Sequence, residues 1–152
     1  WILLPRIKYE TRVLNIKLFY CKYYIAYGRV TINSGKSAQY TVAMNSAINI
    51  VRKMVGTPET KKCEATLSQI ASDKFNQTQA ELKMKEYLVK SAYKKLRTFG
   101  HANIEEENIV YKPFYLCLCE KHGKKYRRVV DAEVGERDYL LEYQYKNLVF
   151  PE

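Results

Sequence analysis

Two cysteines and a histidine near the end of the chain are the residues best suited to metal or thiol chemistry. They are Cys117, Cys119 and His122, and a fourth ligand could come from Cys21 or Cys63. Thiolate and imidazole groups are the usual ligands of zinc. In an extended strand, however, alternate side chains lie about 6–7 Å apart, which is wide for one tetrahedral ion. We therefore expect no metal and no cofactor, and we interpret both cysteines as small apolar side chains packed under a helix.

Nucleophilic and phosphate-transfer motifs are also lacking. The two histidines, His101 and His122, stand in no local signature with a cysteine or serine. The acidic run at 105–107 precedes a predicted strand and is typical of a solvated turn. Gly35-Lys36-Ser37 lacks the earlier glycine of a P-loop. The sequence therefore predicts a protein that is not an enzyme.

Charge and tyrosine content point to a contact surface. The 152 residues carry a formal net charge of +10, with a pI of about 9.4, and 14 of them are tyrosines. An excess of positive charge favours nucleic acid, an anionic membrane face or an acidic protein as partner, although it also serves solubility alone. Tyrosine rings are usually half-buried with the hydroxyl in water or paired, as on an exposed sheet face.

Basic residues concentrate in two places. One is a stripe at helical spacing, formed by Lys83, Lys90, Lys94 and Arg97. The other is the segment 121–128, in which Tyr126 stands among Lys124, Lys125, Arg127 and Arg128. Lysine and arginine for phosphates, with aromatic rings for stacking, are typical of proteins that bind RNA or single strands. A solvated helix face and a charged edge strand would give the same pattern.

The elements that must position these residues follow from the hydrophobic period. Apolar residues alternate from Ile7 to about Met54 and again after Gly100, which predicts half-buried strands. The expected strands are 14–20, 23–32, 39–44, 48–54, 109–119, 126–130 and 138–145. Asn and Gly residues at 33–36, 45–46, 120–124 and 131–135 predict the intervening turns.

Helices are expected between the two strand regions. Met84, Leu88, Ala92 and Leu96 recur every four residues, which predicts a helix over about 78–99, with Gly100 as its C-terminal cap. Thr66 and Gln69 have the spacing of a capping box, so a short helix is expected to begin there and run toward Phe75.

The two strand regions match as an internal repeat. Tyr20 aligns with Tyr111, Tyr23 with Phe114, and the Asn45 turn with the Asp131 turn. We interpret the chain as two strand–turn–strand units, about 14–54 and 109–145, joined by a helical segment at about 66–99. The repeated tyrosines suggest a binding face that includes Tyr23, Tyr27, Tyr115 and Tyr126.

One segment resembles a known family. Residues 126–136, Tyr-Arg-Arg-Val-Val-Asp-Ala-Glu-Val-Gly-Glu, resemble the strand–turn–strand signature of PepSY-like domains, with Val134 where that pattern has Thr. The resemblance covers about a tenth of the chain. It implies a sheet packed on a helix, no catalytic residues, and an inhibitory or regulatory role that is often found outside the cytoplasm.

Together these patterns predict a single α+β domain over residues 1–152, with antiparallel strands from both ends packed on one long central helix. The strands could form one sheet or two, and a swapped or homodimeric arrangement fits equally well. We expect a non-catalytic binding or regulatory module that acts through the Tyr-rich sheet face, with a protein partner or a second copy. The alternative is a nucleic-acid-binding accessory protein that uses residues 83–97 and 121–128. No transmembrane segment is expected, and the cytoplasm is the default compartment because the cysteine spacing is not that of a disulfide scaffold.

Overall fold

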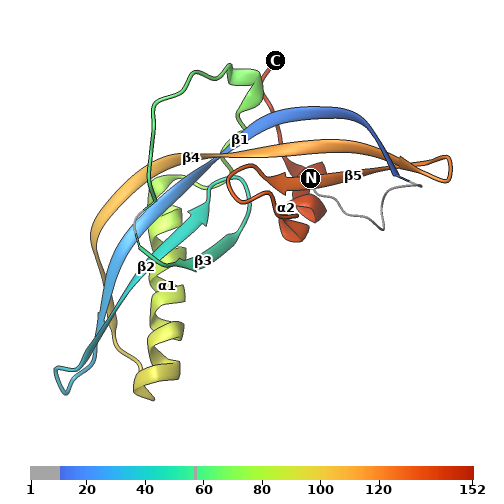
Figure 1. Ribbon diagram of the computed structural model, residues 1–152. Helices are drawn as coiled ribbons and strands as arrows, with labels where there is room; N and C mark the ends of the chain where they lie inside the picture. The colour runs from blue at the N-terminus through green and yellow to red at the C-terminus, as the bar shows by residue number, and fades with distance from the viewer. Residues whose placement is uncertain (1–10, 57) are drawn as a thin grey trace.

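The computed structural model describes residues 11–56 and 58–152 (Figure 1). Five antiparallel strands form one sheet in the order β3-β2-β1-β4-β5. The strands are β1 (Thr11–Thr31), β2 (Ser37–Asn45), β3 (Ile50–Met54), β4 (His101–Lys121) and β5 (Lys124–Asp131). The helices are α1 (Gln77–Leu96) and α2 (Tyr139–Gln144), with short 3-10 turns η2 (Leu67–Gln69) and η3 (Tyr145–Asn147). The architecture is α+β, and the predicted beginning of the sheet region at Ile7 lies outside the described residues.

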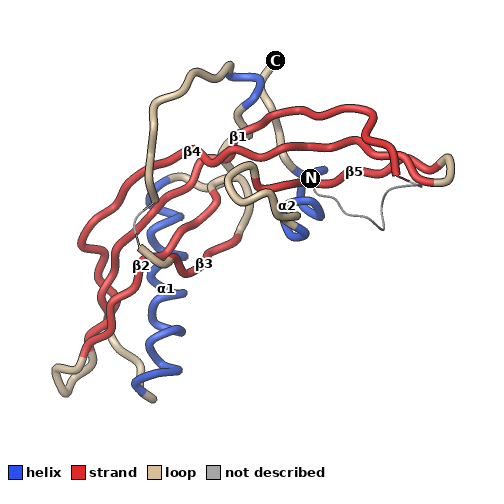
Figure 2. Tube along the Cα trace, viewed as in Figure 1, coloured by secondary structure: helices blue, strands red, loops and turns tan. Residues whose placement is uncertain are grey.

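The two central strands are much longer than the sequence pattern suggested. β1 and β4 are 21 residues each and pair with one another from Thr11↔Lys121 to Thr31↔His101 (Figure 2). The prediction of separate strands at 14–20 and 23–32 is therefore wrong. β2 pairs with the second half of β1, whereas β5 pairs with the second half of β4, so the two hairpins lie at opposite ends of the sheet.

The core consists of two clusters on opposite faces of this sheet. Tyr24, Ala26 and Val30 of β1 pack with α1, in what we call the α1 cluster. Phe19 and Cys21 pack instead with α2, in the α2 cluster. Because successive side chains of a strand point to opposite faces, the even and odd positions of β1 define an α1 face and an α2 face. One strand pair thus carries two cores.

Helix α1 follows its predicted apolar stripe. Its buried side chains are Ala80, Met84, Leu88 and Ala92, at the four-residue spacing seen in the sequence. Asn76 caps the N-terminus by accepting a hydrogen bond from the Gln79 amide at 2.8 Å. The helix ends at Leu96 with Arg97 in the left-handed region (φ 59°), so Gly100 is not its cap. α1 covers the half of the α1 face formed by β2, the second half of β1 and the first half of β4, and is not central to the whole sheet.

The shorter elements depart from prediction in two places. The capping box of Thr66 and Gln69 is present, but it opens only a single 3-10 turn, and the chain is extended again from Ile70. The segment 138–145, predicted as a strand, is helix α2 followed by η3. Asp138 caps α2 by accepting from the Leu141 amide, and Leu141, Tyr145 and Leu148 then meet the α2 cluster at helical spacing.

None of the helices within the described ranges combines the length and the apolar character that crossing a bilayer requires.

Candidate binding surfaces

The four tyrosines expected to share one face are divided between both faces. Tyr23 and Tyr27 occupy odd positions of β1 and lie on the α2 face. Tyr23 packs against the α2 cluster, where Asn45 donates to its hydroxyl at 3.2 Å, and burial raises the pKa of that hydroxyl well above its usual range. Tyr115 and Tyr126 lie on the α1 face, with the Arg128 guanidinium over the Tyr126 ring at 5.1 Å. Of the four, Tyr115 is the exposed one.

Tyr115 belongs to a row of apolar side chains on the part of the α1 face that α1 does not reach. We call this row, formed by Ile16, Leu18, Ile109, Tyr111 and Tyr115, the apolar strip. Leu18 is paired with Tyr115 in the β1–β4 register, so the two side chains are direct neighbours. Ile16 is 58% exposed and Tyr111 50%. The strip begins beside the first turn of α1, where Ile109 and Gln77 line one hollow, and runs from there toward the β4–β5 hairpin.

Cys117 and Cys119 lie on β4, and His122 lies in the turn that follows it. Cys117 is half-buried and Cys119 buried, and neither belongs to the α1 cluster, so the predicted packing under that helix is wrong. Burial raises the pKa of both thiols, which disfavours the thiolate that a metal or a nucleophilic reaction needs. His122 forms the β4–β5 turn with Gly123, both at positive φ (50° and 73°). Within the described residues, His, Cys, Asp and Glu side chains form no group of three that could hold a metal.

The two basic segments lie in different halves of the molecule. Lys83, Lys90, Lys94 and Arg97 follow α1, with the Lys83 ammonium over the Phe75 ring at 5.2 Å. Lys124, Lys125, Arg127 and Arg128 are on β5, at the far end of the sheet (Figure 1). Strand alternation also divides the second group, because Arg127 lies over the Tyr145 ring on the α2 face whereas Arg128 is on the α1 face. The structure therefore does not unite the two segments in one surface.

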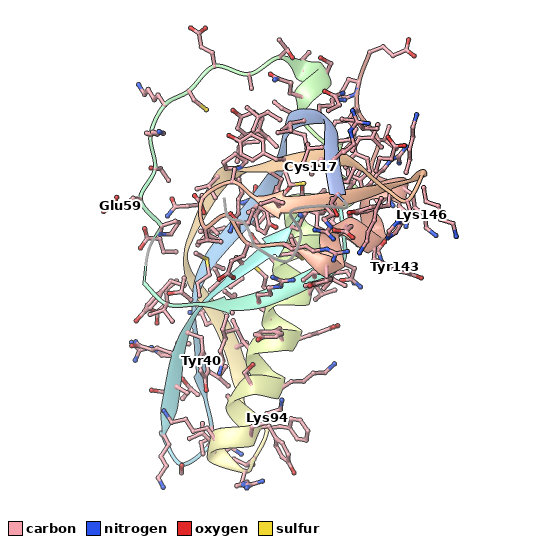
Figure 3. The ribbon with its side chains drawn as sticks, turned by 45° about the vertical axis from the view of Figure 1, so that its right-hand side comes forward. Tyr40, Glu59, Lys94, Cys117, Tyr143 and Lys146 are labelled. Carbon is pink, nitrogen blue, oxygen red and sulfur yellow. The ribbon has the colours of Figure 1, made fainter. Side chains whose placement is uncertain are left out.

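Lys94 instead meets residues from a distant part of the chain. A groove of about 430 Å³ runs between α1 and the β2–β3 edge of the sheet. Its lining residues are Tyr40, Lys53, Tyr87, Ser91, Lys94 and Lys95. We call it the α1–β3 groove. Figure 3 shows Tyr40 of β2 and Lys94 of α1 in the same region, well away from Cys117, Tyr143 and Lys146. Sequence reasoning found only Lys94, since the other lining residues carry no local signal and come together through strand pairing.

A second group that the sequence did not indicate surrounds α2. Tyr139 and Tyr143 are both 68% exposed, and the Arg137 guanidinium lies 4.3 Å from the centre of the Tyr139 ring. The Lys146 ammonium lies 5.4 Å from the centre of the Tyr143 ring, and both residues are on the side of the molecule that carries α2 (Figure 3). The i,i+4 spacing of these tyrosines was the available signal, but it was hidden by the expectation of a strand.

Comparisons of the chain with protein-family models, with curated proteins and with solved structures give no match. The resemblance of residues 126–136 to PepSY-like domains therefore stays a prediction.

Proposed function

We propose that the chain is a non-catalytic binding module that holds a protein partner against the apolar strip. The partner presents an apolar segment flanked by acidic residues. The observation that carries this proposal is the row of exposed Ile16, Ile109, Tyr111 and Tyr115 on adjacent paired strands.

The chemistry of the strip supports protein contact. Monomeric proteins seldom leave neighbouring large apolar side chains exposed, and tyrosine is enriched in protein interfaces because its ring is rigid and amphipathic. On the other half of the same sheet face, the side chains of α1 cover the equivalent layer. A helix or strand from another protein would complete that layer over the strip. The net charge of +10 favours an acidic partner.

A role in binding also agrees with the thiol chemistry. Burial raises the pKa of Cys117, Cys119 and Cys21, the last to about 12, so these thiols are protonated near neutral pH. Protonated thiols are poor nucleophiles and poor metal ligands.

Site-specific crosslinking tests the proposal. A photoreactive phenylalanine derivative placed at Tyr115 is expected to capture one acidic protein in cells that make this chain, whereas the same group at Val149, exposed but outside the strip, does not capture it. The purified pair should then bind with an affinity that falls about tenfold or more in Ile16→Lys, because an unpaired charge enters the contact. Leu82→Lys is the matched control, since Leu82 is exposed on α1. If the crosslinked product is a homodimer, the partner is a second copy of this chain and not another protein. An unchanged affinity in Ile16→Lys would refute the role of the strip.

We also propose that the two hairpins are copies of one unit. Tyr23 pairs with Asn45, and Phe114, its partner in the repeat, pairs with Asp131. Support comes from one further pair of matching hydrogen bonds, in which Asn45 Oδ1 accepts from the Ala47 amide and Asp131 Oδ1 accepts from the Glu133 amide, each at 2.9 Å. If Asp131 serves this turn as Asn45 does, then Asp131→Asn keeps the melting temperature within a few degrees while Asp131→Ala lowers it further. Equal losses in both variants would contradict the shared turn.

Nucleic-acid binding is the second candidate function. The observation that favours it is the collection of three lysines in the α1–β3 groove.

A further inference from the structure

The α1–β3 groove is an open hollow with room for a small organic ligand. Its floor comes from the sheet, with Tyr40 on β2 and Lys53 on β3, and its wall comes from the second half of α1. A volume of about 430 Å³ lies within the range of sites for small organic ligands and exceeds what inorganic phosphate alone needs.

The groove offers only hydrogen-bond donors with positive charge and neutral hydroxyls. Lys53, Lys94 and Lys95 supply three ammonium groups, while Tyr40, Tyr87 and Ser91 supply three hydroxyls. The lining contains no carboxylate. Across residues 11–56 and 58–152, none of the three lysines takes part in an ion pair. The Lys53 ammonium rests over the Tyr40 ring at 4.4 Å, a weak contact that a phosphate could replace.

Another hollow among the described residues makes a useful contrast. It lies at the N-terminus of α1 and is also lined by lysine and tyrosine. There, however, Asp73 brings a carboxylate into the lining and accepts from Lys22 at 2.9 Å and from Ser46, so within the described part of the chain one of the two lysines, Lys22, is already paired while Lys74 is not. Of these two hollows, the α1–β3 groove has the greater excess of positive charge, with three lysines and no carboxylate among its lining residues.

We propose that the α1–β3 groove binds a phosphate-bearing ligand of nucleotide size. Lys94 and Lys95 hold the phosphate, and Lys53 moves from the Tyr40 ring to join them. The hydroxyls of Tyr87 and Ser91 donate to the remaining phosphate oxygens. Free nucleotides and single-stranded nucleic acid share this chemistry, so either can be the source.

The dipole of α1 disfavours an anion at this end of the helix, so the positive charges of the lysines must outweigh it. Lys94 and Lys95 lie in the last turn of α1, where the helix dipole is negative. Binding must therefore depend on side-chain charge and not on free backbone amides, which distinguishes this groove from a phosphate site at a helix N-terminus. The inference is independent of the apolar strip, because the groove and the strip use different residues.

Fluorescence anisotropy with a short fluorescein-labelled oligothymidylate tests the groove. The double variant Lys94→Gln/Lys95→Gln is expected to bind about tenfold more weakly than the unmodified chain, and the salt slope of binding should fall by about 0.7 for each lysine lost. The matched control is Lys61→Gln/Lys62→Gln, which removes the same charge from an exposed loop. Tyr40→Phe, which changes no charge, should leave the salt slope unchanged. Thermal unfolding of each variant confirms that all are folded.

Competition then identifies the source of the phosphate. If ATP or UMP displaces the probe at millimolar concentration and inorganic phosphate does not, the ligand is a free nucleotide. If only unlabelled oligonucleotide displaces it, the ligand is a strand. Equal weakening in the groove and control double variants would show that net charge alone attracts the probe and would overturn the proposal. Failure of the probe and of millimolar ATP to bind at low salt would overturn it as well.

Discussion

The contact between Gly28 and Leu88 gives the sharpest test of how α1 sits on the sheet. Gly28 lies in β1, under the middle of α1, and a Cβ built on it would be 2.4 Å from Leu88 Cδ1. Carbon atoms in proteins prefer separations of about 3.5–4.0 Å, so the Leu88 side chain would have to retreat by about 1 Å or more. Leu88 is fully buried in the α1 cluster, so that movement would press its side chain against packed neighbours.

Gly28→Ala is therefore expected to lower the free energy of unfolding. Overpacking costs about 1–3 kcal/mol, and the better strand propensity of alanine returns about 0.5–1 kcal/mol, which leaves a net loss of between about 0 and 2.5 kcal/mol. Leu88→Ala alone should cost about 2–5 kcal/mol because it leaves a cavity. In the double variant the new methyl group has space and fills part of that cavity. The double variant should thus be more stable than the sum of the single variants predicts, by about 1–2 kcal/mol.

Urea unfolding followed by far-UV circular dichroism measures these free energies. Leu82→Ala serves as the control on the same helix, because Leu82 is exposed and its truncation should change the free energy of unfolding by less than about 0.5 kcal/mol. A stabilising Gly28→Ala, or strict additivity in the double variant, would refute the close approach of α1 to β1.

Three further predictions concern α2 and the thiols. Asp138→Ala removes the cap that accepts from the Leu141 amide at 2.9 Å and should cost about 1 kcal/mol in thermal unfolding, whereas Asp138→Asn should cost less because asparagine also caps. Burial alone would raise the pKa of Glu142, but hydrogen bonds from Arg137 and the Val129 amide outweigh it and lower that pKa. The stabilising effect of Glu142 is therefore present above the unfolded pKa of about 4.3 and is lost as the pH falls through the lower folded value. The stability gap between the unmodified chain and Glu142→Gln should close in acid, and a gap independent of pH would contradict this assignment. Maleimide labelling with peptide mass spectrometry should modify exposed Cys63 first and half-buried Cys117 more slowly, while buried Cys21, with its pKa raised to about 12, and buried Cys119 react only on unfolding. Rapid modification of Cys21 would show that the α2 cluster is open.

The sequence predicted elements whose apolar residues keep one period throughout. Met84, Leu88 and Ala92 fall on one helix face that packs on one surface, so α1 was found within one to three residues of its observed ends. Two strands, 14–20 and 23–32, were predicted in place of β1 because the buried face of β1 changes along its length. Phe19, Tyr20 and Cys21 are all buried. Phe19 and Cys21 face the α2 cluster, and Tyr20, on the opposite face of the strand, is covered as well. Buried and exposed residues therefore stop alternating at this point of β1, and the sequence near Tyr20 does not show that both faces are covered.

Helix α2 and the α1–β3 groove were missed for related reasons. Six residues of helix are too few to show a period, and the tyrosines and leucines of 139–145 fit a strand equally well. In the groove, Tyr40 and Lys53 come from strands while Tyr87 and Lys94 come from a helix far along the chain. Their proximity depends on the β2–β3 register and on the position of α1, which no spacing in the sequence encodes.

The division of the core between two faces of the β1–β4 pair also protects the pairing itself. Because strand side chains alternate, a slip of one residue would turn every β1 side chain to the opposite face. In a sheet with one covered face, such a slip exposes the apolar side chains of that face and buries polar ones in their place. Here it would remove Tyr24 and Ala26 from α1 and, in the same step, Phe19 from the ring of Phe114, which lies 5.6 Å away. Packing on either face thus opposes a slip that would disturb the other face, and two strands of 21 residues stay paired from end to end, with register shifts at only two places, between Val13 and Asn15 and between Tyr27 and Gly28.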